Sequence, residues 1–172
     1  MTLTAQKIFD KAVHYLERYG SSAENLRRVL LRGLKRREIK FHDVPAEAPQ
    51  WVDQAVEKCL RLNLVNDALY AEARVASLRR QGRSKNYIQR TLMQKGVDRK
   101  TVSQFLSDDA EDEETAAKRY AQKKRLGVFG GGKKGIDAQR KDLAKMLRAG
   151  FSMNVAKKAL RSDVETDDIF DE

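Results

Sequence analysis

The sequence predicts an all-α fold, built from three tandem three-helix repeats that are each loosely similar to a helix-turn-helix and form an elongated array. Apolar residues recur at helical spacing along most of the chain, and only two prolines interrupt 172 residues. A short motif also repeats: Gly82-Arg83-Ser84 precedes Lys95-Gly96 as Gly20-Ser21-Ser22 precedes Arg32-Gly33, and Arg148-Ala149-Gly150 repeats its second half. Gly33 and Gly96 are 63 residues apart, and Gly96 and Gly150 are 54 residues apart. Repeats of this length are typical of stacked units of a few helices each.

The first predicted repeat covers residues 5–62. An apolar stripe predicts a helix over 5–19, which Gly20 ends. Ser22 caps a second helix that reaches about Arg37. Pro45 and Pro49 break the chain, and Pro49 is well placed to start a third helix that ends near residue 62.

The second predicted repeat covers residues 63–107. Asn66 or Asp67 caps a helix that runs to about residue 81. Ser84 opens a helix over 85–95, Gly96 closes it, and Asp98 caps a last helix over 99–106.

The third predicted repeat covers residues 108–161, with helices over 112–126, 137–149 and 152–160. The acidic cluster Asp108–Glu114 is interpreted as the start of the first of these helices, because acids complement the helix dipole there. Lys123–Arg125 would end the same helix. Residues 162–172 carry six acids and no base, which predicts an acidic, disordered tail.

The charge balance indicates an acidic partner. The net charge is +10 and the pI is about 9.8, which favours nucleic acid or another polyanion. The whole excess lies in residues 1–107, which hold 21 basic and 11 acidic residues. Low aromatic content, 7%, argues against one large core.

Two clusters of basic residues are the candidate binding sites. Arginine binds carboxylate or phosphate through two parallel hydrogen bonds, so either cluster can contact an acidic protein surface or a DNA backbone. The alternative is that these charged side chains only form the solvated outer faces of their helices. The candidates are Arg27, Arg28 and Arg32 in the first repeat, where Lys35, Arg36 and Arg37 extend the cluster, and Arg79, Arg80, Arg83, Lys85, Arg90 and Lys95 in the second. Tyr70 and Tyr87 are predicted to pack in the core rather than to stack on bases.

Other chemistries find little support in the sequence. Cys59 is the single cysteine and reads as a core residue, and His14 and His42 lack ligand spacing, so no metal, cofactor or catalytic site is expected. The run Gly127–Lys134 resembles a phosphate-binding loop but has Lys134 where Ser or Thr is required, and Gly127–Gly135 is therefore interpreted as a flexible loop. There is no signal peptide and no membrane span, which predicts a cytoplasmic protein.

Residues 66–97 carry a resemblance to a known family. The runs Asn66-Asp67-Ala68-Leu69-Tyr70-Ala71, Ser77-Leu78-Arg79-Arg80-Gln81-Gly82-Arg83-Ser84 and Ile88-Gln89-Arg90-Thr91-Leu92-Met93-Gln94-Lys95-Gly96-Val97 strongly resemble the RecX family. The resemblance extends over roughly residues 7–160, and the first repeat looks like alphaproteobacterial members. It implies a curved array of three-helix repeats that lies in the groove of the RecA filament on single-stranded DNA.

The implied activity is not enzymatic. The resemblance implies a mainly negative regulator that caps or destabilises the filament and lowers RecA ATPase and strand exchange, in DNA recombination, DNA repair and the SOS response. We expect a monomer that makes at most weak, sequence-independent contact with DNA. The alternative from the residues alone is a direct nucleic-acid-binding protein whose repeats act as helix-turn-helix modules.

Overall fold

A computed structural model describes residues 2–107, 112–131 and 135–161 of the chain, and within these ranges the regular structure is entirely helical. The predicted all-α class is thereby confirmed. The chain packs as two compact units: residues 1–73 with 92–102, and residues 74–91 with the part of the chain from 103 onward.

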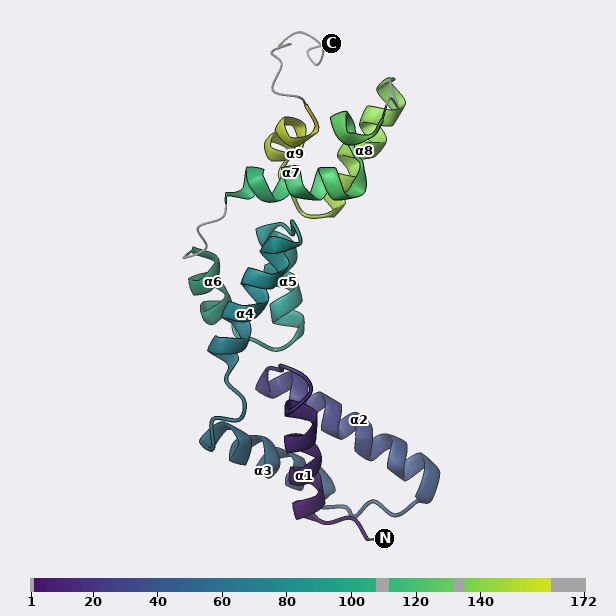
Figure 1. The fold of residues 1–172 in the computed structure, drawn as a ribbon. Coiled ribbons are helices and arrows are strands. Elements are labelled where there is room, and N and C mark those ends of the chain that lie inside the picture. The colour runs from purple at the N-terminus through teal and green to yellow at the C-terminus, as the bar shows by residue number, and fades with distance from the viewer. Residues whose placement is uncertain (1, 108–111, 132–134, 162–172) are drawn as a thin grey trace. The chain divides into compact units, whose positions relative to one another are not determined.

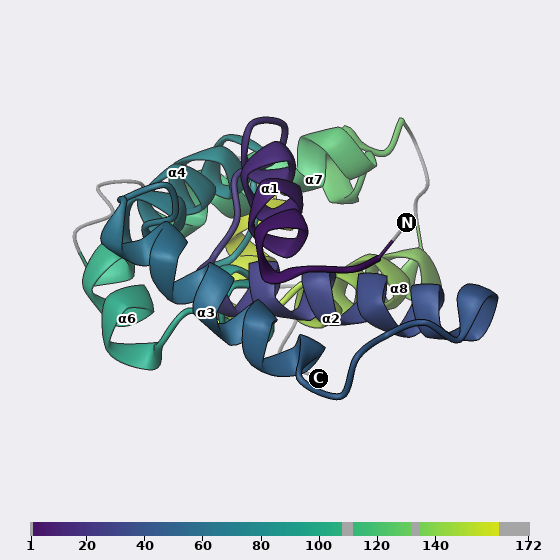
Figure 2. The same ribbon diagram turned by 90° about the horizontal axis from the view of Figure 1, so that it is seen from below.

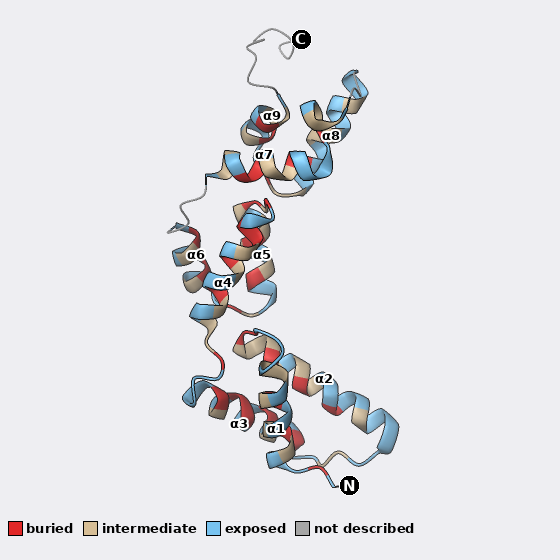
Figure 3. Cartoon of the chain, in the orientation of Figure 1, coloured by how far each residue is buried: buried red, intermediate tan, exposed pale blue. Residues whose placement is uncertain are grey.

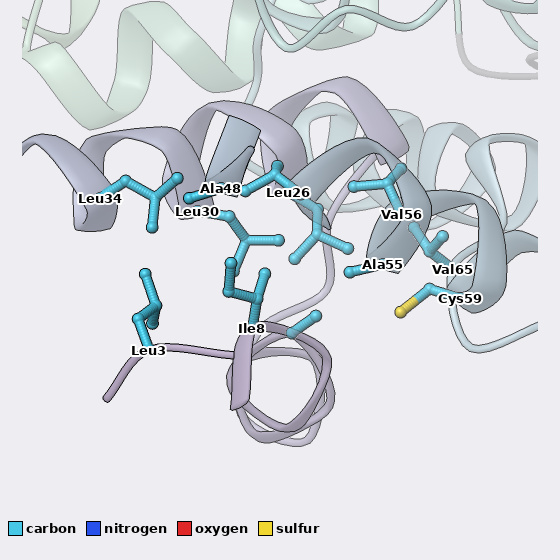
Figure 4. Packing of buried hydrophobic residues seen from close by; sticks show 12 residues of the cluster. Leu3, Ile8, Leu26, Leu30, Leu34, Ala48, Ala55, Val56, Cys59 and Val65 are labelled. Carbon is cyan, nitrogen blue, oxygen red and sulfur yellow. The ribbon is translucent and has the colours of Figure 1, made fainter. Parts of the chain in front are cut away.

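The first unit is organised around three helices, α1 (Ala5–Leu16), α2 (Ala23–Phe41) and α3 (Ala48–Arg61). Helix α1 packs against both α2 and α3, and α2 packs against α3 (Figures 1 and 2). Their facing sides form one apolar core, in which Ile8, Leu26 and Cys59 are almost fully buried (Figure 4). The prediction that Cys59 is a core residue is confirmed, since its exposure is 0%.

The next three helices are α4 (Asp67–Arg80), α5 (Lys85–Gln94) and α6 (Arg99–Ser107). Their bounds agree with the expected helices to within one residue or so at each end. The two compact units divide the chain inside these helices, so they do not follow the predicted repeat boundaries at 62/63 and 107/108. Those boundaries therefore stay a prediction.

The second unit contains α7 (Glu113–Lys124), the 3-10 turn η1 (Gly127–Phe129), α8 (Ile136–Arg148) and α9 (Met153–Leu160). Helix α9 packs on α7 and α8. Alanines dominate this core and allow close helix contacts, while Met146 and Phe151 fill the larger spaces. Figure 3 marks the buried residues along α7 and α9. Glu113 and Glu114 occupy the first turn of α7, and Lys123 and Lys124 the last, as expected from the helix dipole.

Two predicted helix ends in the first unit are wrong. Helix α1 ends at Leu16 rather than at Gly20, and the rings of Tyr15 and Tyr19 lie 5.1 Å apart across the turn that follows. Helix α2 continues past Arg37 to Phe41, where His42 adopts a left-handed conformation. Contacts of the last turns hold this extension: Arg37 pairs with Asp43, and a Glu38 carboxylate oxygen accepts from Val44 N.

Gly33 does not play the part that the repeated motif predicts. It lies inside α2, far from either end of the helix, and an added Cβ would meet no atom within 4 Å. Of the three glycines in the repeated motif, Gly96 and Gly150 end a helix, whereas Gly33 does not.

The glycine-rich segment 127–135 is more ordered at its start than a flexible loop. Gly127 begins η1, and its backbone N–H donates to Asp142 Oδ2 at 3.0 Å, which holds the turn against α8. The predicted acidic tail, and parts of the acidic cluster and of the glycine-rich segment, lie outside the described residues. Among the helices described, none has both the length and the apolar character needed to cross a membrane.

Candidate binding surface at the helix junctions

Two junctions between helices are built alike, and each lies within one compact unit. We call the contact of residues 22–28 with 94–96 the first junction, and that of residues 84–90 with 147–150 the second junction. In each, a serine that caps a helix also donates its hydroxyl to the last carbonyls of another helix. Ser22 Oγ donates to Lys95 O, and Ser84 Oγ donates to Ala149 O at 2.7 Å.

A carboxylate completes each of these caps. The amide of Ala23, the first residue of α2, donates to Asp67 Oδ1 at 2.8 Å. The amide of Lys85, the first residue of α5, lies 3.1 and 3.3 Å from the two carboxylate oxygens of Glu113. Both acids lie at the start of a later helix, so each stabilises two helix N-termini at once.

Gly96 and Gly150 close the junctions. Their φ angles are +81° and +93°, a region that side chains with a Cβ rarely adopt. A Cβ on Gly150 would lie 2.6 Å from Ser84 Oγ, and one on Gly96 would overlap the Glu24 side chain. The serine and glycine echo of the sequence therefore records two copies of one junction.

The structure gives Arg79 an internal role. Its side chain is only 2% exposed, and Nη1 lies 2.8 Å from Glu113 Oε2 and 3.0 Å from Arg83 O. Arg119 Nη1 in turn donates to Arg79 O at 2.9 Å. A guanidinium held in this way stabilises the second unit and is not presented to a partner.

The cations of the first junction contact other groups of the protein, and carboxylates neutralise the two arginines among them. Arg27 Nε lies 2.6 Å from Asp53 Oδ1, a contact that raises the pKa of the guanidinium. Arg28 Nε lies 2.7 Å from Glu24 Oε1, and its Nη1 donates to Gln94 O, also at 2.7 Å. The ammonium of Lys95 contacts Asn25 Oδ1 at 3.2 Å.

The second junction holds more open cations. Arg90 and Arg148 are exposed and line a hollow of about 500 Å³ together with Asn86, Gln89, Leu147 and Gly150. Among the residues that the structure describes, neither arginine makes an ion pair or hydrogen bond. Arg83, nearby in sequence, places its guanidinium 4.6 Å from the centre of the Tyr87 ring.

The remaining candidates lie on other parts of the helices. Arg80 is exposed at the end of α4 and Lys85 is half-buried at the start of α5. Arg32 lines a groove of about 470 Å³ between α1 and α2, with Lys11, Arg36 and Arg37 beside it. Tyr70 and Tyr87, which were predicted to pack in the core, are half-buried.

Sequence reasoning missed two cations of these hollows, Lys11 and Arg148, as candidates. The signal for Arg148 was present, because it stands two residues before Gly150 in the repeated motif. Lys11 carried no signal, since only the packing of α1 on α2 brings it to the groove. No group of three or more metal-binding side chains occurs within the described ranges.

These features define a class of protein: an all-helical protein of recurring serine-capped, glycine-closed junctions that presents basic hollows on its surface. Comparison with known proteins agrees with this class. Residues 66–106 match the sequence model described as RecX, second three-helix domain. The chain is 43% identical over 156 residues to the regulatory protein RecX of Myxococcus xanthus, covering 88% of this chain and 83% of that one.

Other relatives and solved structures extend the match. The regulatory protein RecX of Agrobacterium fabrum is 28% identical over 157 residues, which cover 91% of this chain and 83% of the relative. The crystal structure of RecX from Lactobacillus salivarius shares the fold with a TM-score of 0.66 at 21% identity, covering 91% of this chain and 94% of that one. The chain belongs to the RecX family, whose named members here are regulatory proteins.

Proposed function

We propose that this chain regulates the RecA recombinase without catalysing a reaction, by binding the RecA filament on single-stranded DNA and lowering its ATPase and strand-exchange activity. The proposal places it in the cytoplasm, in recombinational DNA repair and the SOS response. The observation that supports it most is the 43% identity to a RecX regulatory protein over 88% of the chain. A net charge of +10 suits a filament that carries DNA.

The proposed contact surface consists of the basic side chains that the structure leaves at the surface. Its exposed members include Arg32, Arg80, Arg90 and Lys95. Arg27, Arg28 and Arg83 stay candidates whose side chains must exchange an internal contact for a partner. Lys85 stays a candidate with a half-buried side chain. Arg79 is assigned to the interior instead. Several weak contacts to one filament add up to high avidity.

The test of this function is the ATPase rate of RecA on single-stranded DNA as the purified chain is titrated in. We expect inhibition at well below one molecule per RecA protomer, since a filament is stopped by capping or destabilising a small number of positions. An unchanged rate at saturation, with helicity confirmed by circular dichroism, would contradict the proposal.

A second candidate function is direct binding to nucleic acid, which the unpaired Arg90 and Arg148 favour. Binding of bare DNA at a range of salt concentrations separates the two functions. Tight, sequence-selective binding with a steep salt dependence would favour the second function, whereas weak and sequence-blind binding agrees with the first.

A further inference from the structure

The two junctions match position by position, but their charges differ. Two residues after the capping serine stands Glu24 in the first junction and Asn86 in the second. Six residues after it stands an arginine in both, Arg28 and Arg90. Because Glu24 neutralises Arg28 at 2.7 Å and Asn86 has no charge, only the second junction keeps its arginine available.

A second difference adds another cation. Two residues before the closing glycine stands Gln94 in the first junction and Arg148 in the second. Gln94 O accepts a hydrogen bond from Arg28, which draws that guanidinium onto the protein. In the second junction it is Asn86 Nδ2 that contacts the facing helix end, donating to Gly150 O at 3.0 Å, so the backbone there is satisfied without either arginine.

The resulting hollow is rich in donors and contains no carboxylate. Two guanidinium groups and two carboxamides line it, with the partly exposed Leu147 beside them. The hollow is largely open to solvent, and its volume of about 500 Å³ exceeds what one carboxylate side chain fills. Arginine, asparagine and glutamine are the side chains that commonly bind DNA phosphates and base edges.

We propose that the second junction is a nucleotide-binding site for single-stranded DNA, with the phosphate on Arg90 and Arg148 and the sugar and base against Leu147 and the Gln89 carboxamide. The first junction has the same arrangement, but there Glu24 neutralises the corresponding arginine, Arg28. This inference deepens the proposed function and rests on it, because the filament is where this chain would meet single-stranded DNA.

The test is the salt dependence of binding to a fluorescently labelled oligothymidylate, followed by anisotropy. Each phosphate contact contributes about 0.7 to the slope of log K against log salt for single strands. We expect Arg90→Gln and Arg148→Gln each to lower the slope by about 0.7 and to weaken binding at low salt several-fold. Arg61→Gln, an exposed arginine at the end of α3, serves as the control and should leave both quantities unchanged.

A charge swap tests the comparison of the junctions without removing a cation. Asn86→Glu installs the carboxylate that the first junction has, and it should weaken oligothymidylate binding as much as Arg90→Gln does. Asn86→Gln is its neutral control and should bind at least several-fold more tightly than Asn86→Glu. Thermal melting of each variant shows that the second unit is still folded.

Equal slopes and affinities for the wild type, Arg90→Gln, Arg148→Gln and Asn86→Glu would overturn the nucleotide site. So would variants that lose binding to RecA in the absence of DNA while their DNA slope stays at the wild-type value, since that result assigns the hollow to an acidic protein surface. The wild-type ATPase titration is read separately. Inhibition by the wild type beside unchanged DNA slopes in the variants rejects the nucleotide site and keeps the proposed function.

Discussion

At the scale of single residues, the structure divides the arginines by what surrounds them. Arg79 and Arg80 are neighbours in sequence, yet Arg79 is buried against Glu113 and Arg80 is exposed. The sequence shows a basic cluster here but not the direction of each side chain. The acid that fixes Arg79 lies 34 positions further along the chain, so only tertiary packing reveals the pair.

The role of Arg79 leads to a stability prediction. Arg79→Ala should lower the free energy of unfolding by about 2–4 kcal/mol, because it removes one partner of a largely buried ion pair and the support of the Arg83 carbonyl. Urea unfolding followed by circular dichroism measures the loss. Arg80→Ala is the matched control and should change stability by less than about 0.5 kcal/mol. Equal losses in the two variants would contradict the internal role.

Cys59 leads to a prediction about reactivity and pH. Burial raises the pKa of its thiol, and the thiolate is the reactive form, so a thiol reagent such as DTNB should modify the folded protein far more slowly than the urea-unfolded protein. The folded state therefore favours the protonated thiol more than the unfolded state does. Because the unfolded thiol loses its proton at lower pH, this preference stabilises the fold fully below about pH 8.5, and the stabilisation is lost progressively above it. Rapid labelling of the folded protein at pH 7 would show that the first core opens readily.

At the scale of helices, most starts and ends could be predicted from capping residues. Ser22 and Ser84 were interpreted as the residues before two helices, and the helices that follow them begin where expected. The failures come from helix propensity and from local contacts that the capping residues do not reveal. Gly33 looks like the closing glycine of a helix, but lysine, arginine and glutamate around it favour helix, and the Arg37 and Glu38 contacts extend α2 beyond it.

The serine caps should differ in how much each contributes to the free energy of unfolding. Ser22→Ala and Ser84→Ala each remove a cap and a buried hydrogen bond to another helix, with an expected loss of about 2–3 kcal/mol. Ser152→Ala removes a cap at the exposed start of α9 and should cost only about 1 kcal/mol. Chemical denaturation of the three variants measures these losses. Equal losses in all three would mean that the hydrogen bonds of Ser22 and Ser84 to another helix do not contribute to stability.

Alanine scanning of the repeated glycines separates the two true copies from the third. Gly96→Ala and Gly150→Ala should each destabilise by about 2 kcal/mol or more, because a positive φ and a close neighbour both oppose a Cβ. Gly33→Ala should be neutral or stabilising by up to about 1 kcal/mol, because alanine favours a helix interior and meets open space. Thermal melts test this order, and a destabilising Gly33→Ala would show a backbone requirement in α2.

At the scale of the whole molecule, composition and the residue motifs were sufficient to predict an all-helical member of the RecX family. They did not predict which cations stay available, since that depends on single exchanges such as Glu24 for Asn86 and on partners such as Asp53. The candidate surface is therefore smaller than the set of basic residues in the sequence, and its most open part, the second junction, includes Arg148 from outside that set.

We propose that the chain acts on the RecA filament rather than on DNA or RecA alone. The most direct measurement is the binding of the fluorescently labelled chain to oligothymidylate with and without RecA and a slowly hydrolysed ATP analogue, at physiological salt. We predict an affinity for the assembled filament at least tenfold higher than for bare DNA, because contacts to RecA protomers add to those with DNA. The same affinity with and without RecA would contradict the claim and leave a direct nucleic-acid-binding protein in its place.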